Sequence, residues 1–157
     1  MKKILVIVPF PMSHENLSSR QDQLKSVDIG EGFEFVFRPV KAAPRNYVSQ
    51  SDMVLADVGI LEAGLDAEKE GFLAVCIDTM SDSGVSALRS VLSIPVIGPG
   101  RTSMLIAMSL GSKFSIITMW KKWFHLYEKT INDLGIRSSL ASIRSIDVTP
   151  DNHALLA

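Results

Sequence analysis

The chain has 157 residues and a formal net charge of -1 at pH 7, and hydrophobic residues make up 46% of it. This composition is enough for one domain or two small ones with a sizeable core, and it argues against disorder. Because the sequence has no basic block, we expect no nucleic-acid partner. No apolar run approaches the ~20 residues that a membrane-spanning helix needs, so we expect no membrane partner.

The chain has a single cysteine, Cys76, which excludes an internal disulfide and a cysteine-based metal cluster. Residues 1–9 combine two lysines with a short apolar run, a pattern that would also suit a signal peptide. Prolines interrupt the following residues and no small-residue cleavage pattern appears, so a first β-strand is favoured. We therefore expect a soluble, cytoplasmic protein without a metal site.

The first half of the chain alternates between strand and helix patterns. The strands are predicted at residues 3–9, 33–38, 72–77 and 94–97, and the helices at 18–24, from Ser51 or Asp52 to 71, and after Gly84. The helix before the third strand has an N-cap residue at its start and Gly71 in the place of a C-terminal cap.

The second half continues the alternation. Thr102 is expected to cap a helix that Gly111 ends, and residues 114–118 form the fifth strand. An amphipathic helix is predicted at 121–134 and a sixth strand at 142–148. Thr149 and Pro150 begin a last helix that runs to residue 157 without a closing signal. We therefore expect that part of a longer protein is absent.

Strands that alternate with helices predict an α/β fold, in which a parallel sheet has helices on both faces. In such folds the loops after the strands meet at the carboxyl edge of the sheet and hold the ligand. The loops expected there are residues 9–14, 78–84 and 118–120. His14 is a candidate base in the first loop, although a solvated surface histidine is the simpler interpretation.

The loop after the third strand has the most chemical content. It contains Asp78, Thr79, Ser81, Asp82 and Ser83, and a helical pattern starts directly after Gly84. Its hydroxyl groups and the free N–H groups of the next helix form a candidate site for a carboxylate or phosphate. The alternative is an ordinary capped loop without a ligand.

These segments together resemble the aspartate/glutamate/hydantoin racemase superfamily, most closely its hydantoin-racemase-like branch. The resemblance rests on the opening strand with its proline-containing loop and on four blocks: residues 78–84 (DTMSDSG), 87–89 (ALR), 94–98 (IPVIG) and 113–118 (KFSIIT). It implies flavodoxin-like three-layer lobes with the site between them. Residues 1–98 would form the first lobe, and residues 99–157 the start of an incomplete second lobe.

The resemblance implies cofactor-independent proton transfer at a carbon next to a carbonyl, in a small carboxylate or hydantoin. Family members use two facing cysteines, and the first lies three residues before the aspartate of the loop. That position is Thr79 in this chain. A threonine hydroxyl is a far weaker acid than a thiol and cannot act as a base at neutral pH without activation. Cys76, earlier in the strand, is expected to be an inert core residue.

The residues expected at the site are thus Thr79 in the catalytic position, with the substrate held by Phe10, Pro11, Met80, Ser81, Asp82 and Thr118. A racemase acting on a small molecule is the leading hypothesis. A lyase or decarboxylase of the same superfamily and a catalytically inactive binding protein are the alternatives. A homo-oligomer is also expected.

Overall fold

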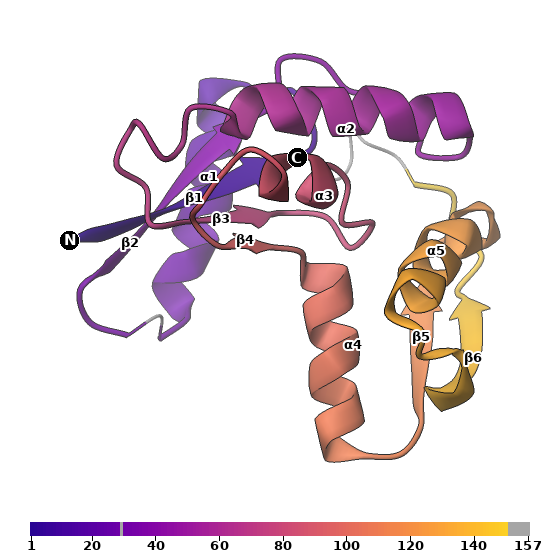
Figure 1. Ribbon diagram of the computed structural model, residues 1–157. Helices are drawn as coiled ribbons and strands as arrows, with labels where there is room; N and C mark the ends of the chain where they lie inside the picture. Colours follow the sequence, from indigo (N-terminus) through magenta and orange to yellow (C-terminus); the bar gives the residue numbers. More distant parts are fainter. Residues whose placement is uncertain (29, 151–157) are drawn as a thin grey trace.

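The chain forms two parallel β-sheets of different size (Figure 1). The computed structural model describes residues 1–28 and 30–150. The larger sheet has the order β2-β1-β3-β4, and its strands are β1 (Lys2–Val8), β2 (Phe33–Pro39), β3 (Ala74–Ile77) and β4 (Val96–Ile97). The smaller sheet pairs β5 (Phe114–Thr118) with β6 (Leu140–Ser145). All pairings are parallel, as predicted.

Strand β1 is central because its apolar run suits burial on both faces. Leu5 and Ile7 are fully buried and point to one face, whereas Val6 points to the other. Val6 is in register with Phe37 of β2 and Cys76 of β3.

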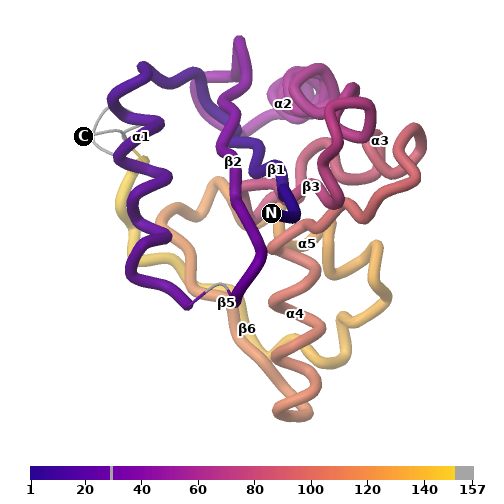
Figure 2. The backbone as a smooth tube through the Cα atoms, turned by 90° about the vertical axis from the view of Figure 1, so that its left-hand side faces the viewer, coloured from indigo at the N-terminus to yellow at the C-terminus, as the bar shows by residue number. Residues whose placement is uncertain are grey.

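Helices cover both faces of the larger sheet, as predicted from the sequence. On one face, α2 (Gln50–Gly64) and α3 (Val85–Arg89) form a core with the strands. On the other face lie α1 (His14–Asp22) and the 3-10 helix η1 (Gln23–Ser26). Arg20, Gln23 and Leu24 of these helices line a hollow there together with Val6, Phe35 and Phe37. Figure 2 shows α1 on the opposite side of the sheet from α2 and α3.

The smaller sheet packs against α4 (Pro99–Leu110) and α5 (Phe124–Leu134). The short 3-10 helices η2 (Lys121–Trp123) and η3 (Arg137–Ser139) precede α5 and β6. Backbone pairing continues past β6, because the N–H groups of Ile146 and Val148 donate to Thr118 and Met119. The pairing therefore reaches Val148, the predicted end of the sixth strand. The strand begins at Leu140, two residues before its predicted start.

Three helix starts differ from the predictions. Ser49 caps α2 in place of Ser51 or Asp52: its hydroxyl accepts from the N–H of Asp52, and the Asp52 carboxylate accepts from the N–H of Ser49. Helix α4 begins at Pro99, so Thr102 lies inside it. Helix α1 begins at residue 14, four residues before the predicted start.

Helix α3 starts directly after Gly84, as predicted, but its first turn is capped differently than expected. Gly84, with a φ of 72°, precedes the helix, and no side chain of the loop caps it. Its N–H donates to Asp57 of α2 at 2.6 Å. This helix end is therefore already bound to a carboxylate of the protein, and α3 has only five residues. The Gly84 N–H is therefore not free for the anion that the sequence predicted at this position.

The larger sheet ends at Ile97 and α4 starts at Pro99. The division into lobes 1–98 and 99–157 is a proposal that these separate sheets support. We call the parts of the described chain that hold the larger and the smaller sheet the first lobe and the second lobe. The helix predicted from Thr149 falls mainly on residues 151–157, which lie outside the described residues. Among the helices of residues 1–28 and 30–150, none is long and apolar enough to cross a membrane.

Candidate functional site

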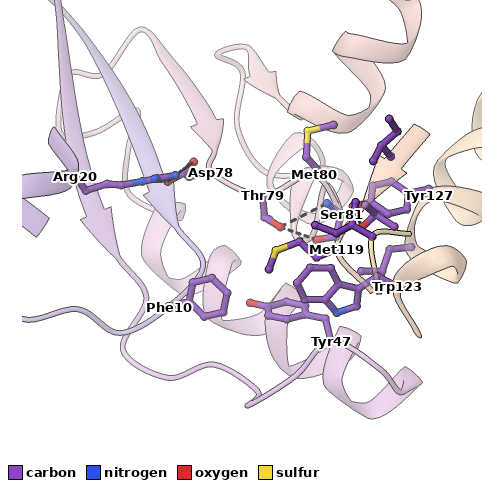
Figure 3. Close-up of a pocket in the computed structure, with 14 residues that line it drawn as sticks. Phe10, Arg20, Tyr47, Asp78, Thr79, Met80, Ser81, Met119, Trp123 and Tyr127 are labelled. Atoms are coloured by element: carbon purple, nitrogen blue, oxygen red, sulfur yellow. Dashed lines mark hydrogen bonds and ion pairs between the residues drawn. The ribbon is translucent and has the colours of Figure 1, made fainter. Parts of the chain in front are cut away.

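A pocket of about 550 Å³ opens between the carboxyl ends of β1, β3 and β5 (Figure 3). Both sheets contribute to it, because parallel strands present the loops that follow them at one edge. The pocket is lined by Phe10, Arg20, Tyr47, Asp78, Thr79, Met80, Ser81, Ile117, Thr118, Met119, Trp123, Leu126, Tyr127 and Ile146.

Most of the predicted site residues meet in this pocket. Its lining includes Phe10 after β1, Thr79, Met80 and Ser81 after β3, and Thr118 at the end of β5. Pro11 and Asp82 are not among the lining residues. Pro11 is exposed on the loop after β1, and His14 is exposed at the start of α1.

The polar groups of the β3 loop form a chain of hydroxyls. Thr79 Oγ1 lies 3.2 Å from Ser81 Oγ, which lies 2.9 Å from Ser83 Oγ. A hydroxyl donates one hydrogen and accepts others. When Ser83 donates to Ser81 and Ser81 donates to Thr79, the hydrogen of Thr79 is left for a ligand. Such chains polarise their members, which makes the terminal hydroxyl a better donor.

A second hydroxyl pair lies in the smaller sheet's part of the pocket. Thr118 Oγ1 and Tyr127 Oη are 2.9 Å apart, and both residues are buried. Figure 3 shows Tyr127 on the α5 side and Thr79 on the β3 side. The pocket therefore offers neutral hydrogen-bonding groups from both lobes, within walls that are mostly apolar.

Asp82 points away from the pocket and holds the two lobes together. Its carboxylate accepts from the N–H groups of Gly100 at 2.8 Å and Arg101 at 2.7 Å, and from Arg101 Nε at 3.2 Å. Its side chain is only 2% exposed. The β3 loop and the start of α4 lie very close together. A Cβ on Gly98 would lie 2.6 Å from Asp82 Oδ1, and a Cβ on Gly100 would lie 2.3 Å from the Met80 carbonyl oxygen. The Gly-Pro-Gly sequence thus permits contact between the β3 loop and α4.

The charged groups at the pocket neutralise each other. Arg20 donates from Nε to Asp78 Oδ2 at 2.9 Å and from Nη2 to Asp78 Oδ1 at 2.8 Å. The pair joins α1 to the end of β3 in a two-pronged geometry that guanidinium and carboxylate groups favour. Arg20 is the only cation among the lining residues that the structure describes. A ligand in this pocket therefore meets little net charge.

Aromatic rings form one wall of the pocket. Phe10 contacts Tyr47 edge-to-face, with ring centroids 5.7 Å apart. Tyr47 Oη donates to the Pro9 carbonyl at 2.8 Å, and burial raises the pKa of Tyr47 above its ordinary range. Tyr47 is therefore a neutral structural donor. Trp123 Nε1 is buried without a hydrogen-bond partner in the described part of the chain.

Several lining residues were missed or misjudged from the sequence. Trp123 lines the pocket, and Trp120, in the loop expected at this edge, contacts its ring, with centroids 6.4 Å apart. The sequence alone did not single out Arg20, Tyr47, Trp123 or Tyr127. Trp123 and Tyr127 are four residues apart, which places them on one face of the predicted helix, but this spacing does not show that the face borders a pocket.

Cys76 lies in β3 and is half-buried rather than fully buried. Burial raises the pKa of its thiol, so little reactive thiolate forms at neutral pH. The residue is not part of the pocket lining. Within residues 1–28 and 30–150, no group of histidine, cysteine, aspartate and glutamate side chains is arranged to hold a metal ion.

Known structures share this fold. The allantoin racemase of Klebsiella pneumoniae superposes with a TM-score of 0.83 at 22% identity, over 94% of this chain and 60% of that one. A doubly substituted arylmalonate decarboxylase in its liganded form superposes with a TM-score of 0.62 at 14% identity, over 99% of this chain and 69% of that one. At these identities the likeness shows the fold alone.

Sequence comparison identifies the family. The hydantoin racemase of Pseudomonas sp. (strain NS671) is 29% identical over 105 residues, which cover 67% of this chain and 42% of that protein. The chain thus spans less than half the length of this curated relative. The model of the Asp/Glu/Hydantoin racemase family matches residues 13–155. The chain therefore belongs to the aspartate/glutamate/hydantoin racemase family.

Proposed function

We propose that this chain forms a binding site for a small carbonyl compound, within a protein that transfers a proton at the carbon next to that carbonyl. One observation carries the proposal: the hydroxyls of Thr79 and Ser81 from one lobe and of Thr118 from the other share an apolar pocket. A carbonyl whose neighbouring carbon loses a proton gains negative charge on oxygen, and preorganised donors in a dry site stabilise it.

The substrate we propose is a neutral cyclic amide of the hydantoin type with an apolar substituent. The paired Arg20 and Asp78 leave no free cation among the lining residues described, and a free carboxylate would need one. The aromatic and aliphatic wall suits an apolar substituent. Hydantoin and allantoin, which the names of two similar proteins mention, are neutral cyclic amides.

Thr79 is proposed as a hydrogen-bond donor and not as the base. A base at this position would need a neighbouring group to take the hydroxyl proton, and no histidine or lysine is among the lining residues described. We therefore propose that the 157-residue chain binds its ligand without racemising it, and that Thr79→Cys does not create activity in this chain. We also propose a cytoplasmic location, which the absence of any disulfide partner for Cys76 supports.

A decarboxylase of the same superfamily is the second candidate. The similarity in fold to arylmalonate decarboxylase favours it, as does the lack of a thiol at position 79, because decarboxylation needs only one group to protonate the product carbon. In that case the pocket would have to accept a carboxylate in spite of the paired Arg20. A binding protein without catalysis is the third candidate.

A matched pair of ligands tests the proposal. Calorimetry compares a hydantoin that has a benzyl group at C5 with its ring-opened N-carbamoyl amino acid, which has the same substituent and a carboxylate. We expect the hydantoin to bind more tightly. Thr79→Val or Thr118→Val should weaken its binding about five-fold, since a hydrogen bond contributes about 1 kcal/mol. Thr102→Val on α4, outside the pocket lining, is the matched control.

Tighter binding of the ring-opened acid would contradict the proposed substrate and favour the decarboxylase. Exchange of the C5 hydrogen, followed by NMR in deuterated water, tests the role of Thr79. We expect no exchange above background with the 157-residue chain. Exchange that Thr79→Val abolishes would show that Thr79 takes part in proton transfer.

A further inference from the structure

Helix α2 is apolar around most of its circumference. Met53, Ala56 and Ile60 on its inner side are buried. Its outer side is exposed, yet it too is apolar: the exposed fractions are 52% for Val54, 58% for Leu55, 59% for Val58 and 48% for Leu65. Figure 1 shows α2 along the upper edge of the molecule, where only the loop that precedes the helix arches above it. A helix that is apolar all round is normally buried on all sides.

The apolar residues of the outer side have the spacing of a helix-pairing seam. Val54, Val58, Leu61 and Leu65, which we call the α2 stripe, are separated by four, three and four residues. This is the spacing at which two helices pack side by side. Leu61 is half-buried and reaches the core at one edge of the stripe, whereas the other three are exposed. The spacing indicates that another helix covers the stripe.

A groove of about 370 Å³ runs beside the stripe. Its floor includes Gly59, where a Cβ would lie 2.9 Å from the Ala42 carbonyl oxygen, so the segment after β2 lies close to the helix. Lys41 and Glu62 also line the groove and form an ion pair with each other. The groove therefore has an apolar floor and a rim whose charges cancel.

We propose that the α2 stripe is a dimer interface, in which α2 packs antiparallel against α2 of a second copy across a two-fold axis. The axis lies between Val58 and Leu61. Val54 then faces the partner's Leu65, and Val58 faces the partner's Leu61. Each of these two facing pairs combines a smaller valine with a larger leucine, which allows the side chains of the two helices to interdigitate. An isologous interface requires this kind of self-complementarity.

The charges beside the stripe favour a second copy over an unrelated partner. In this register Asp57 faces the partner's Gly64, and Glu62 faces the partner's Leu55, so no like charges oppose each other. Glu62 keeps its ion pair with Lys41, and the partner's Leu55 is placed beside the groove. The net charge of -1 adds little long-range repulsion between copies.

The size of the surface sets the expected affinity. A stable interface buries roughly 800 Å² per partner, and a helix of 15 residues with the adjoining groove provides an interface of modest size. We therefore expect a dimer that dissociates at micromolar concentrations. The proposal does not depend on the proposed function, because the stripe lies on the outer side of α2, and no α2 residue lines the pocket.

Sedimentation velocity over a range of concentrations tests the interface. The chain should shift from monomer to dimer, and Val58→Glu should keep it monomeric. Ile106→Glu is the matched control, since Ile106 is 56% exposed on α4. Circular dichroism verifies that both variants fold. A chain that is monomeric at all concentrations, or a dimer that Val58→Glu leaves intact, would overturn the proposal.

A charge pair tests the antiparallel register. Val54→Glu and Leu65→Lys should each weaken the dimer, and the double variant should regain it, because each new charge faces its opposite on the partner. The two positions are eleven residues apart on the helix, so they cannot pair within one copy. Failure of the double variant to regain dimerisation overturns the antiparallel register.

Discussion

The two lobes contain the same kinds of elements but close their cores differently. In the first lobe the four-stranded sheet has helices on both faces, and residues such as Leu5, Ile60 and Val75 are fully buried. In the second lobe α4 and α5 pack on one face of two strands. Most apolar residues in its core are only half-buried, and Ile117 on the other face of β5 is 75% exposed.

The difference indicates that the number of strands, more than the strand–helix pattern, determines how completely a lobe of this chain buries its apolar core. Two strands present few inward-facing side chains, so they leave most of the apolar residues around them half-buried. The second lobe therefore depends on what joins it to the first, and Asp82 is that junction.

The largest expected difference between a variant and its control comes from this junction. Asp82→Ala should lower the free energy of unfolding by about 3 kcal/mol, because it removes a buried carboxylate that pairs with the half-buried Arg101 and leaves two N–H groups without acceptors. Asp147→Ala is the matched control: Asp147 also has a positive φ, of 58° against 54°, but its ion pair with Lys121 is exposed. Urea unfolding measures both.

Equal losses in the two aspartate variants would mean that backbone strain, and not the junction, determines the stability. In that case the contact between the β3 loop and α4 would contribute little, and the two lobes would have to be held together in another way.

The comparison of the cores predicts the next largest difference. Ile60 in the first lobe and Ile131 in the second are both fully buried. Ile60→Ala should cost about 4 kcal/mol and Ile131→Ala about 2 kcal/mol, because half-buried neighbours such as Phe114 and Leu140 can move into the smaller cavity. Thermal and urea unfolding measure the loss. A larger loss for Ile131→Ala would reverse the comparison.

The N-terminus of α2 provides a smaller test within the first lobe. Ser49→Ala should cost about 1 kcal/mol, since the Ser49 hydroxyl accepts from the N–H of Asp52. Ser51→Ala should cost less, because Ser51 lies inside the helix and is exposed. A larger effect at Ser51 would contradict the observed helix start.

The smallest expected effect concerns pH. The N–H groups of Val48 and Ser49 hold the pKa of Asp52 below its ordinary value. The unfolded chain therefore takes up this proton more readily than the folded chain. The stabilisation is fully present above the ordinary pKa, near ~4, and is lost as the pH falls through the lower folded pKa. Asp52→Asn should lower stability at pH 7 and flatten its dependence between pH 5 and 2. An unchanged slope would contradict this.

The strands and their parallel pairing could be predicted because their signal is local: apolar runs bounded by glycine and proline. Some missed helix starts also had local signals. Ser49 and Asp52 have the spacing of a capping box, and Pro99 suits the first turn of α4. The start of α3 after Gly84 was predicted, but the partner of the Gly84 N–H had no local signal, since Asp57 comes from another element, 27 residues away.

The site could be predicted in part. Thr79, Ser81 and Thr118 follow strands, and the rule that strand ends share an edge brought them together. The true environment of Asp82 depends on the close approach of Gly98 and Gly100, which involves contacts between separate segments. Trp123 and Tyr127 line the pocket because of the orientation of the second lobe. The spacing of residues along the sequence does not specify that orientation.

The contact between Asp82 and α4 has a mechanical consequence. Both carboxylate oxygens of Asp82 are bound at the first turn of α4, and Thr79 lies only three residues earlier. If the lobes swing as rigid bodies, the loop must travel with α4 or else this contact must break. Thr79 is thus held from both sides: Asp78 before it is bound to the Ile7 carbonyl and to Arg20 in the first lobe, and Asp82 after it is bound to α4 in the second. A change in the angle between the lobes therefore has to be absorbed within the few residues that include Thr79.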